Sequence, residues 1–128
     1  MTKDQRVLVV DRSEETHEVL ETALARRGVH TYSARRFRHG VELAEQIRPD
    51  LIVLDLDLDE ADPEAFRVPF VPASPQNATP LVVLGSARRS SSDSSLSQFV
   101  RKPYDYGPLV RKIEELLVGV DSSAGRGV

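Results

Sequence analysis

Three aspartates, Asp55, Asp57 and Asp59, alternate with leucines near the middle of the chain. They follow Leu51–Leu54, a run of four apolar residues that is typical of a strand buried on both faces of a sheet. A carboxylate at the end of such a strand is costly unless it has a partner or a function. Because ligands of open α/β sheets bind at the carboxyl ends of the strands, Asp55 is the first candidate for a functional residue.

Other polar groups also stand where apolar runs end. They are Asp11 after residues 6–10, Gly85 and Ser86 after residues 80–84, and Lys102 after residues 99–101. If the strands are parallel, their carboxyl ends meet at one edge of the sheet, and carboxylates, a hydroxyl or glycine backbone and an ammonium group come together there. This combination predicts a polar ligand site built around Asp55.

The elements that position these groups alternate between strand and helix patterns. The expected strands are residues 6–11, 29–34, 51–55, 80–84 and 99–101, and the expected helices are residues 13–27, 40–48 and 109–117. Ser13 is a predicted N-cap, Gly28 a predicted C-terminal cap residue, and Pro49 ends the second helix. The alternation favours a parallel sheet with helices on both faces.

We therefore expect a flavodoxin-like α/β fold with three layers and a five-stranded parallel sheet in the order 2-1-3-4-5, which places Asp11 beside Asp55. The third and fourth helices are expected to be short or missing. Asp62 and Pro63 favour one or two helical turns, but Pro69, Pro72 and Pro75 prevent a longer helix. Six serines at residues 88–98 favour a loop or a very short helix.

The composition is typical of a globular domain. A length of 128 residues predicts one domain, expected at residues 1–120, with a flexible tail or linker at residues 121–128. The net charge of −3 does not favour contact with nucleic acid or a membrane surface, and the absence of cysteine excludes disulfides and thiolate catalysis. Without an apolar run of transmembrane length or a signal peptide, a cytoplasmic location is expected.

Three motifs occur together in the order of a known family. They are Val9–Asp11, the segment Pro49–Asp55, and Phe99–Pro103. Over residues 6–118 the chain resembles the receiver domains of bacterial two-component response regulators. The resemblance implies a signalling domain in a phosphorelay rather than an enzyme. It also implies a sensor histidine kinase or phosphotransfer protein as one partner, and a downstream protein or fused output domain as another; a homodimer stays open.

The resemblance also implies roles for single residues. Asp55 would be the phosphoacceptor, and Lys102 would pair first with Asp55 and then with a phosphoryl oxygen. A magnesium ion would be held by Asp11, Asp55 and Asp57, the last through its backbone carbonyl. Phe99 occupies the place of an aromatic residue that often changes rotamer on phosphorylation, although its interpretation as a plain core residue is favoured over that role.

The chain departs from the family pattern in its pocket. Arg12 stands where the family usually has a second acid, which predicts weaker magnesium binding unless the Asp57 carboxylate replaces that acid or the guanidinium replaces the cation. Gly85 stands where the family has Thr or Ser, and Ser86 would need a local bulge to take that place. The segment before the fifth strand is also short for the family.

These departures leave alternative functions open. One is a pseudo-receiver that binds a protein partner without being phosphorylated. A more remote one is a phosphatase of the haloacid dehalogenase type, because Asp55-Leu56-Asp57 resembles its Asp-x-Asp motif and Ser86 and Lys102 could serve its later motifs. The histidines His17, His30 and His39 are expected to be ordinary surface or rim residues, away from the strand ends.

Overall fold

The computed structural model describes residues 4–66, 79–86 and 97–125. Within these residues, five parallel strands form one sheet in the order β2-β1-β3-β4-β5. The elements are β1 (Arg6–Val10), α1 (Glu14–Ala25), β2 (His30–Ala34), α2 (Phe37–Ile47), β3 (Leu51–Asp55), the 3-10 helix η1 (Pro63–Phe66), β4 (Leu81–Gly85), β5 (Ser97–Arg101) and α3 (Tyr106–Gly125). The flavodoxin-like fold and strand order predicted from the sequence are confirmed.

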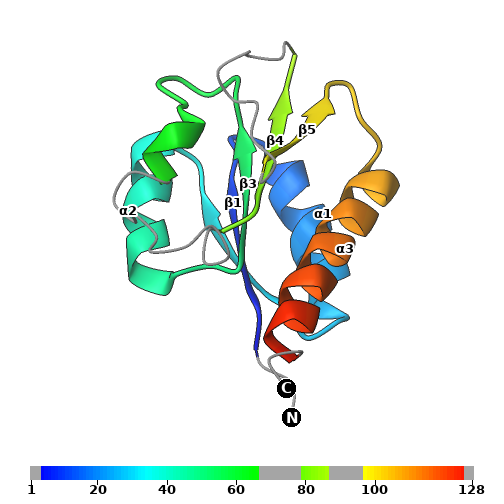
Figure 1. Ribbon diagram of the computed structural model, residues 1–128. Coiled ribbons are helices and arrows are strands. Elements are labelled where there is room, and N and C mark those ends of the chain that lie inside the picture. The colour runs from blue at the N-terminus through cyan, green and yellow to red at the C-terminus, as the bar shows by residue number, and fades with distance from the viewer. Residues whose placement is uncertain (1–3, 67–78, 87–96, 126–128) are drawn as a thin grey trace.

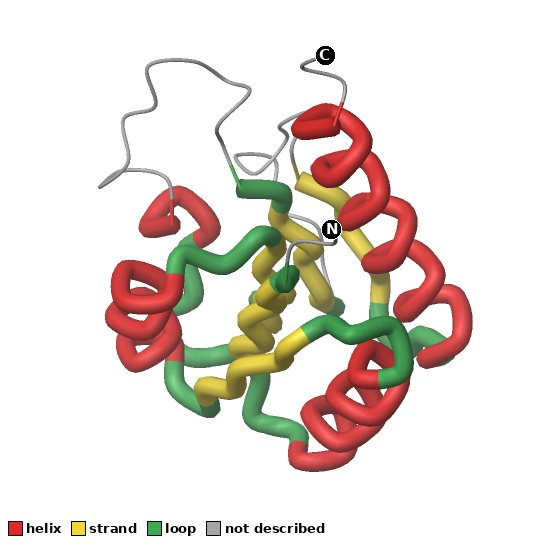
Figure 2. Tube along the Cα trace, turned by 90° about the horizontal axis from the view of Figure 1, so that it is seen from below, coloured by secondary structure: helices red, strands yellow, loops and turns green. Residues whose placement is uncertain are grey.

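The sheet is the middle of three layers. Helices α1 and α3 cover one face, and α2 with η1 lies on the other (Figure 1). Figure 2 shows the same separation from below, with the strands running between the two groups of helices. No helix in the described residues is long and apolar enough to cross a membrane.

Side chains alternate between the two faces along each strand, as the pleat of a strand requires. Val7 and Val9 pack with α1 and α3, whereas Leu8 and Val10 pack with α2 on the opposite face. Strands β3 and β4 divide in the same way between the two core clusters. Both faces of the central strands are thus buried, which explains why their sequences read as continuous apolar runs.

The caps of α1 follow the sequence. The Ser13 hydroxyl accepts a hydrogen bond from the Thr16 backbone N–H at 3.2 Å, so Ser13 is the N-cap as predicted. After the C-cap residue Arg26, Gly28 adopts a left-handed backbone with φ of 77°. Helix α2 ends at Ile47, and its C-cap residue Arg48, directly before Pro49, is also left-handed.

Helix α2 begins at Phe37, three residues before the predicted start at Gly40. Gly40 lies inside the helix because the helix approaches the sheet closely there: a Cβ atom on Gly40 would lie 2.7 Å from Val10 Cγ2. The glycine marks a packing contact and not a helix boundary. This contact fixes α2 against the strand that carries Asp11 at its end.

Other bounds also differ from those predicted. Strand β5 begins at Ser97, so residues 97 and 98 are strand and not loop or helix. Helix α3 runs to Gly125, past the predicted domain boundary at residue 120. Helix η1 begins at Pro63 as expected. The proline-rich residues 67–78 and the serine-rich residues 87–96 lie outside the described part of the chain, as do residues 126–128, so the expected short fourth helix stays a prediction.

Candidate functional site

The strand ends bring Asp11 and Asp55 to the same edge of the sheet. Strands β1 and β3 pair in register up to Val10 and Leu54, the residues directly before the two aspartates. Asp55 is 5% exposed and Asp11 is 3% exposed. Two buried carboxylates at neighbouring strand ends form the base of a site, as the predicted strand order requires.

The backbone around Asp11 holds its carboxylate in place. The Asp11 N–H donates to the carbonyl of Ala34 at 3.0 Å, which extends the pairing of β1 with β2. The Ser13 N–H donates to Asp11 Oδ1 at 2.8 Å. Burial raises the pKa of the Asp11 carboxyl, the bond from Ser13 opposes this, and the nearby Asp55 raises the pKa further. Asp11 therefore carries a charge that the fold does not fully compensate.

Lys102 reaches the site from the end of β5. Its backbone N–H donates to the Gly85 carbonyl at 2.9 Å, so the pairing with β4 continues one residue past the strand. Its Nζ donates to Asp55 Oδ1 at 2.8 Å and lies 3.1 Å from Asp57 Oδ2. Burial lowers the pKa of the Lys102 ammonium, but its bonds to Asp55 and Asp57 raise that pKa by more, and the group is held protonated.

Asp57 enters the site by both its backbone and its side chain. Its N–H donates to Asp55 Oδ1 at 2.9 Å. Its Oδ2 accepts a bond from the Ser86 hydroxyl at 2.9 Å in addition to its ion pair with Lys102. Burial raises the pKa of the Asp57 carboxyl, but the bonds from Lys102 and Ser86 together outweigh this and lower it.

The sequence left two candidates, Gly85 and Ser86, for one position of the site at the end of the fourth strand. Gly85 is the last residue of β4, and a Cβ on it would lie 3.2 Å from Leu56 Cβ and 3.5 Å from Phe99 Cε1. Ser86 follows, and its hydroxyl contacts Asp57. Phe99 is partly buried and packs against the core on the face of the sheet that α2 covers, as a core residue would. A change of its rotamer on phosphorylation stays a prediction.

A pocket of about 380 Å³ opens above the buried carboxylates. It is lined by Asp11, Arg12, Ser13, Asp55, Asp57, Leu58 and Lys102. Arg12 is exposed at this pocket. In the described residues, no three Asp, Glu, His or Cys side chains gather as ligands of one metal ion, so the predicted set of Asp11, Asp55 and Asp57 is not assembled through three carboxylates.

Two of the predicted ligands nevertheless fit a magnesium ion. Asp11 and Asp55 provide two carboxylates, and magnesium in proteins is often held by one or two carboxylates with water and phosphate oxygens. A cation would also stabilise the charged form of Asp11, whose pKa is raised by burial and by the nearby Asp55. The Asp57 side chain is turned to Lys102 and Ser86, which leaves its backbone carbonyl as the group to complete such a site.

A second pocket, of about 550 Å³, adjoins the first and shares Asp11 and Lys102 with it. Its other wall contains Tyr104 and Tyr106, whose rings meet edge to face with centroids 5.6 Å apart. Their hydroxyls lie 3.4 and 3.1 Å from the Thr16 hydroxyl on α1. These residues were not predicted from the sequence; the only signal was the presence of two tyrosines within four residues after Lys102.

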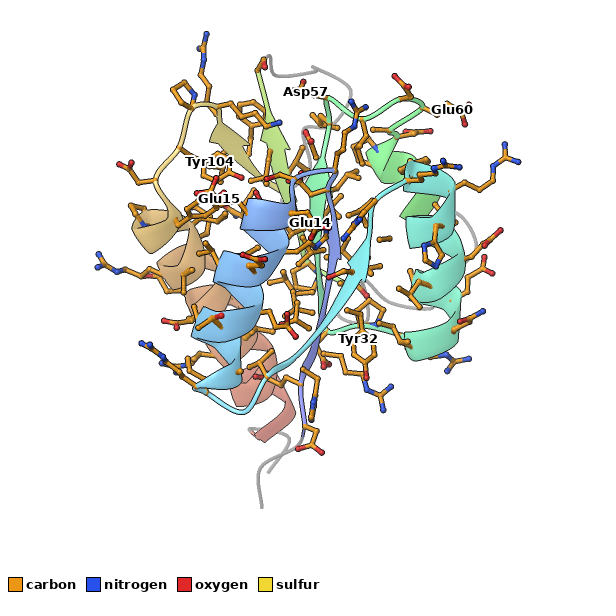
Figure 3. The ribbon with its side chains drawn as sticks, turned by 180° about the vertical axis from the view of Figure 1, so that it is seen from behind. Glu14, Glu15, Tyr32, Asp57, Glu60 and Tyr104 are labelled. Carbon is orange, nitrogen blue, oxygen red and sulfur yellow. The ribbon has the colours of Figure 1, made fainter. Side chains whose placement is uncertain are left out.

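Figure 3 shows side chains around this second pocket from behind. Tyr104 and Glu15, the latter in the first turn of α1, lie at the same end of the sheet as Asp57. Tyr32, on β2, lies away from them. The aromatic residues after Lys102 thus link α3 to α1 next to Asp11.

The prediction for His17 was wrong. His17 is 5% exposed, and its Nε2 lies 2.6 Å from the Asp11 carbonyl oxygen, to which it donates because a carbonyl only accepts. Its Nδ1 is buried without a hydrogen-bond partner. The helical spacing to Leu20 and Leu24, both buried, was the signal for an inward position. His30 and His39 are exposed as expected.

The chain is similar in sequence to known regulators. It is 30% identical over 118 residues to the KDP operon transcriptional regulatory protein KdpE of Escherichia coli, covering 87% of this chain and 50% of that protein. It is 27% identical over 114 residues to the regulatory protein AtoC of the same organism, covering 85% and 24%. The chain thus spans half the length of the first relative and about a quarter of the second. No protein-family model matches it.

Solved structures are similar over nearly the whole chain. The signal receiver domain of a signal transduction histidine kinase from Syntrophus aciditrophicus is 26% identical, with a TM-score of 0.69 and coverage of 91% and 92%. The chemotaxis response regulator CheY4 of Vibrio cholerae is 18% identical, with a TM-score of 0.69 and coverage of 89% and 99%. The second likeness concerns the fold alone.

Proposed function

Since this chain is a receiver domain of the response-regulator family, we propose that it accepts a phosphoryl group on Asp55 from a histidine kinase or a phosphotransfer protein. One observation carries the proposal: Asp55 is buried at the end of β3, and the Lys102 ammonium lies 2.8 Å from its Oδ1. A surface carboxylate that merely ended a strand would need neither burial nor a dedicated cation.

The two oxygens of Asp55 differ in their surroundings. Oδ1 accepts bonds from Lys102 and from the Asp57 N–H, whereas Oδ2 receives no hydrogen bond from the described residues. In the proposed reaction, Oδ2 attacks the phosphorus of a phosphohistidine and forms an O–P bond. The P–N bond breaks, and its electron pair stays on the imidazole nitrogen of the donor.

Charge is the main obstacle to this transfer, because a carboxylate approaches an anionic phosphoryl group. Lys102 would move from Asp55 toward a phosphoryl oxygen, and the Ser86 hydroxyl would donate a second bond. When bound by Asp11, Asp55 and the carbonyl of Asp57, magnesium would offset the remaining charge. We expect the downstream partner to be another protein or a fused output domain, with the phosphoaspartate as the signal and no separate substrate turned over.

A pseudo-receiver is the second candidate. It is favoured by Arg12, a cation in place of an acid at the acceptor pocket, and by Gly85, which offers no hydroxyl at the end of β4. In this case the domain would bind its partner through the same surfaces without modification of Asp55.

Acetyl phosphate with magnesium, followed by intact-mass measurement, separates the two. The phosphoacceptor proposal expects an adduct of about 80 Da, the mass of one phosphoryl group, that is absent in Asp55→Asn. No adduct with acetyl phosphate or with any histidine kinase of the same cell would support the pseudo-receiver. Sustained hydrolysis of p-nitrophenyl phosphate would instead revive the phosphatase alternative.

A further inference from the structure

The Asp57 carboxylate contacts Lys102 and Ser86, the two side-chain donors proposed above to bind a phosphoryl oxygen. We propose that, in the unmodified domain, Asp57 Oδ2 occupies the position of a phosphoryl oxygen and withholds Lys102 and Ser86 from an incoming phosphodonor until it is displaced. The inference rests on the proposed function of Asp55. It assigns to the Asp57 carboxylate, as distinct from its backbone carbonyl, the role of an internal competitor and not of a metal ligand.

The geometry of a single oxygen atom carries this inference. Lys102 Nζ lies 3.1 Å from Asp57 Oδ2, and the Ser86 hydroxyl donates to the same Oδ2 at 2.9 Å. An ammonium and a hydroxyl that converge on one anionic oxygen form the pair of donors that a phosphoryl oxygen would need beside Asp55. The pair is therefore assembled and filled before any phosphodonor arrives.

The backbone places Asp57 in this position. Its N–H donates to Asp55 Oδ1 at 2.9 Å, so the residue two positions past the acceptor is folded back over it. The Leu58 N–H donates to the Asp55 carbonyl at 3.2 Å, which closes the turn. Because the main chain fixes the Cα of Asp57 beside the acceptor, only its side chain needs to rotate for the site to open.

Exposure identifies Asp57 as the member of the network that moves. The side chain of Asp57 is 42% exposed, against 8% for Asp55 and 29% for Lys102. A carboxylate with this exposure regains water when it rotates outward, whereas Asp55 cannot leave its position at the end of β3. Displacement of Asp57 by a phosphoryl oxygen exchanges one anion for another on the same two donors.

Two interpretations of Asp57 predict opposite results for one variant. If its carboxylate were a metal ligand, Asp57→Ala would weaken magnesium binding and slow phosphorylation. If it is an internal competitor, Asp57→Ala frees the donors and speeds phosphorylation. Asp59→Ala is the matched control, because Asp59 is exposed, carries the same charge two residues further on, and contacts neither Lys102 nor Ser86.

Two measurements are made on the wild type, Asp57→Ala, Asp57→Asn and Asp59→Ala. The first is the rate of adduct formation with acetyl phosphate and magnesium, followed by intact mass. The second is binding of beryllium trifluoride, an anion that mimics a phosphoryl group on a carboxylate, followed by fluorine NMR. We expect Asp57→Ala to be about tenfold faster and to bind beryllium trifluoride about tenfold more tightly, the scale of one released charge-assisted hydrogen bond. Asp59→Ala should stay within about twofold of the wild type.

The outcomes separate this inference from the proposed function. If the wild type forms the adduct but Asp57→Ala is no faster, the inference is wrong and Asp55 remains the acceptor. If only Asp57→Ala forms an adduct, and the added change Asp55→Asn removes it, the inference holds and the native domain is a pseudo-receiver. If neither the wild type nor Asp57→Ala forms an adduct or binds beryllium trifluoride, both are wrong. Equal acceleration by Asp59→Ala would also overturn the inference, because net charge would then explain the effect.

Discussion

The acceptor pocket has two regions that are built in different ways. The pocket floor consists of Asp11 and Asp55, which are buried and stand at the ends of adjacent strands. The pocket rim consists of Arg12, Asp57 and Ser86, which are exposed and follow the ends of β1, β3 and β4 by one or two residues. Backbone pairing fixes the floor, whereas side-chain rotamers and a few hydrogen bonds fix the rim. Asp11 and Asp55 match the family pattern and lie in the floor, whereas Arg12, which departs from that pattern, lies in the rim.

The two regions also respond differently to charge. Burial raises the pKa of Asp11 in the floor, whereas donors from Lys102 and Ser86 lower the pKa of Asp57 in the rim. The negative charge of Asp11 in the floor is thus incompletely compensated, whereas that of Asp57 in the rim is stabilised by two donors. Lys102 connects the two regions because its ammonium contacts Asp55 and Asp57.

The largest expected effect comes from removing that connection. Lys102→Ala should slow adduct formation from acetyl phosphate by about 100-fold or more, because a preorganised cation at developing charge contributes on that scale. The rate is followed by intact mass in magnesium. Lys112→Ala, on α3, is the matched control and should leave the rate unchanged. A loss of less than threefold would mean that the floor does not depend on Lys102.

The next largest effect is expected from the packing of α2 against β1, the strand that precedes Asp11. Gly40→Ala places a Cβ 2.7 Å from Val10 Cγ2, so we expect a loss of about 2 kcal/mol in the free energy of unfolding, the usual cost of an overpacked core contact. Urea unfolding measures it. Gly107→Ala is the control, since a Cβ there meets nothing within 4 Å, and it should be neutral or gain up to about 1 kcal/mol as a helix position. Equal effects of both changes would contradict the close approach of α2 to β1.

The rim is tested by restoring the family pattern at Arg12. Arg12→Asp exchanges a cation for a carboxylate at the pocket, and we expect magnesium affinity to rise about tenfold, within the range of charge interactions over several ångströms near a protein surface. Isothermal titration with magnesium measures it. Arg111→Asp makes the same change in net charge on α3 and should raise the affinity by less than twofold. An unchanged affinity in Arg12→Asp would show that the guanidinium stays in solvent.

The smallest expected effect concerns the uncompensated charge in the floor. Asp11→Asn keeps an acceptor for the Ser13 N–H but removes the buried charge, so at pH 7 without magnesium the free energy of unfolding should rise by roughly 1 kcal/mol. The pKa of Asp11 is higher in the folded state than in the unfolded state, and the native state therefore binds the proton more tightly. Lowering the pH through that raised pKa stabilises the wild type, and the advantage of Asn shrinks.

Urea unfolding of the wild type and Asp11→Asn at several values between pH 4 and 7 measures this difference. Asp59→Asn serves as the control for an exposed carboxylate and should change little. A difference between the wild type and Asp11→Asn that grows as the pH falls would contradict the direction of the shift.

The positions of the floor residues could be predicted from the sequence, whereas the contacts of the rim residues could not. Asp11, Asp55 and Lys102 could be placed together because each follows a strand, and parallel strands in a known order determine which ends are neighbours. The contact of Ser86 with Asp57 could not be predicted, because it depends on rotamers of exposed side chains that leave no periodic pattern. The same limit hid Tyr104 and Tyr106, which meet Thr16 across a long separation in sequence.

Two errors had a different cause. The second helix was predicted to begin at Gly40, where its apolar pattern begins, although the helix starts at Phe37 and Gly40 lies inside it in tight contact with Val10. His17 was interpreted as a surface or rim residue because it lies away from the strand ends, although its spacing to Leu20 and Leu24 put it on the buried face of α1. In both cases tertiary packing decided the position of the residue.

The pair of tyrosines beside the pocket has a practical consequence. The chain contains three tyrosines and no tryptophan, and Tyr104 and Tyr106 line the pocket that shares Asp11 and Lys102 with the acceptor site. Ultraviolet emission from the unlabelled domain therefore comes largely from one corner of the molecule, next to the acceptor. Rearrangement of Lys102 or of the first turn of α1 should change that emission. Ligand binding can therefore be followed by the intrinsic tyrosine fluorescence of the domain.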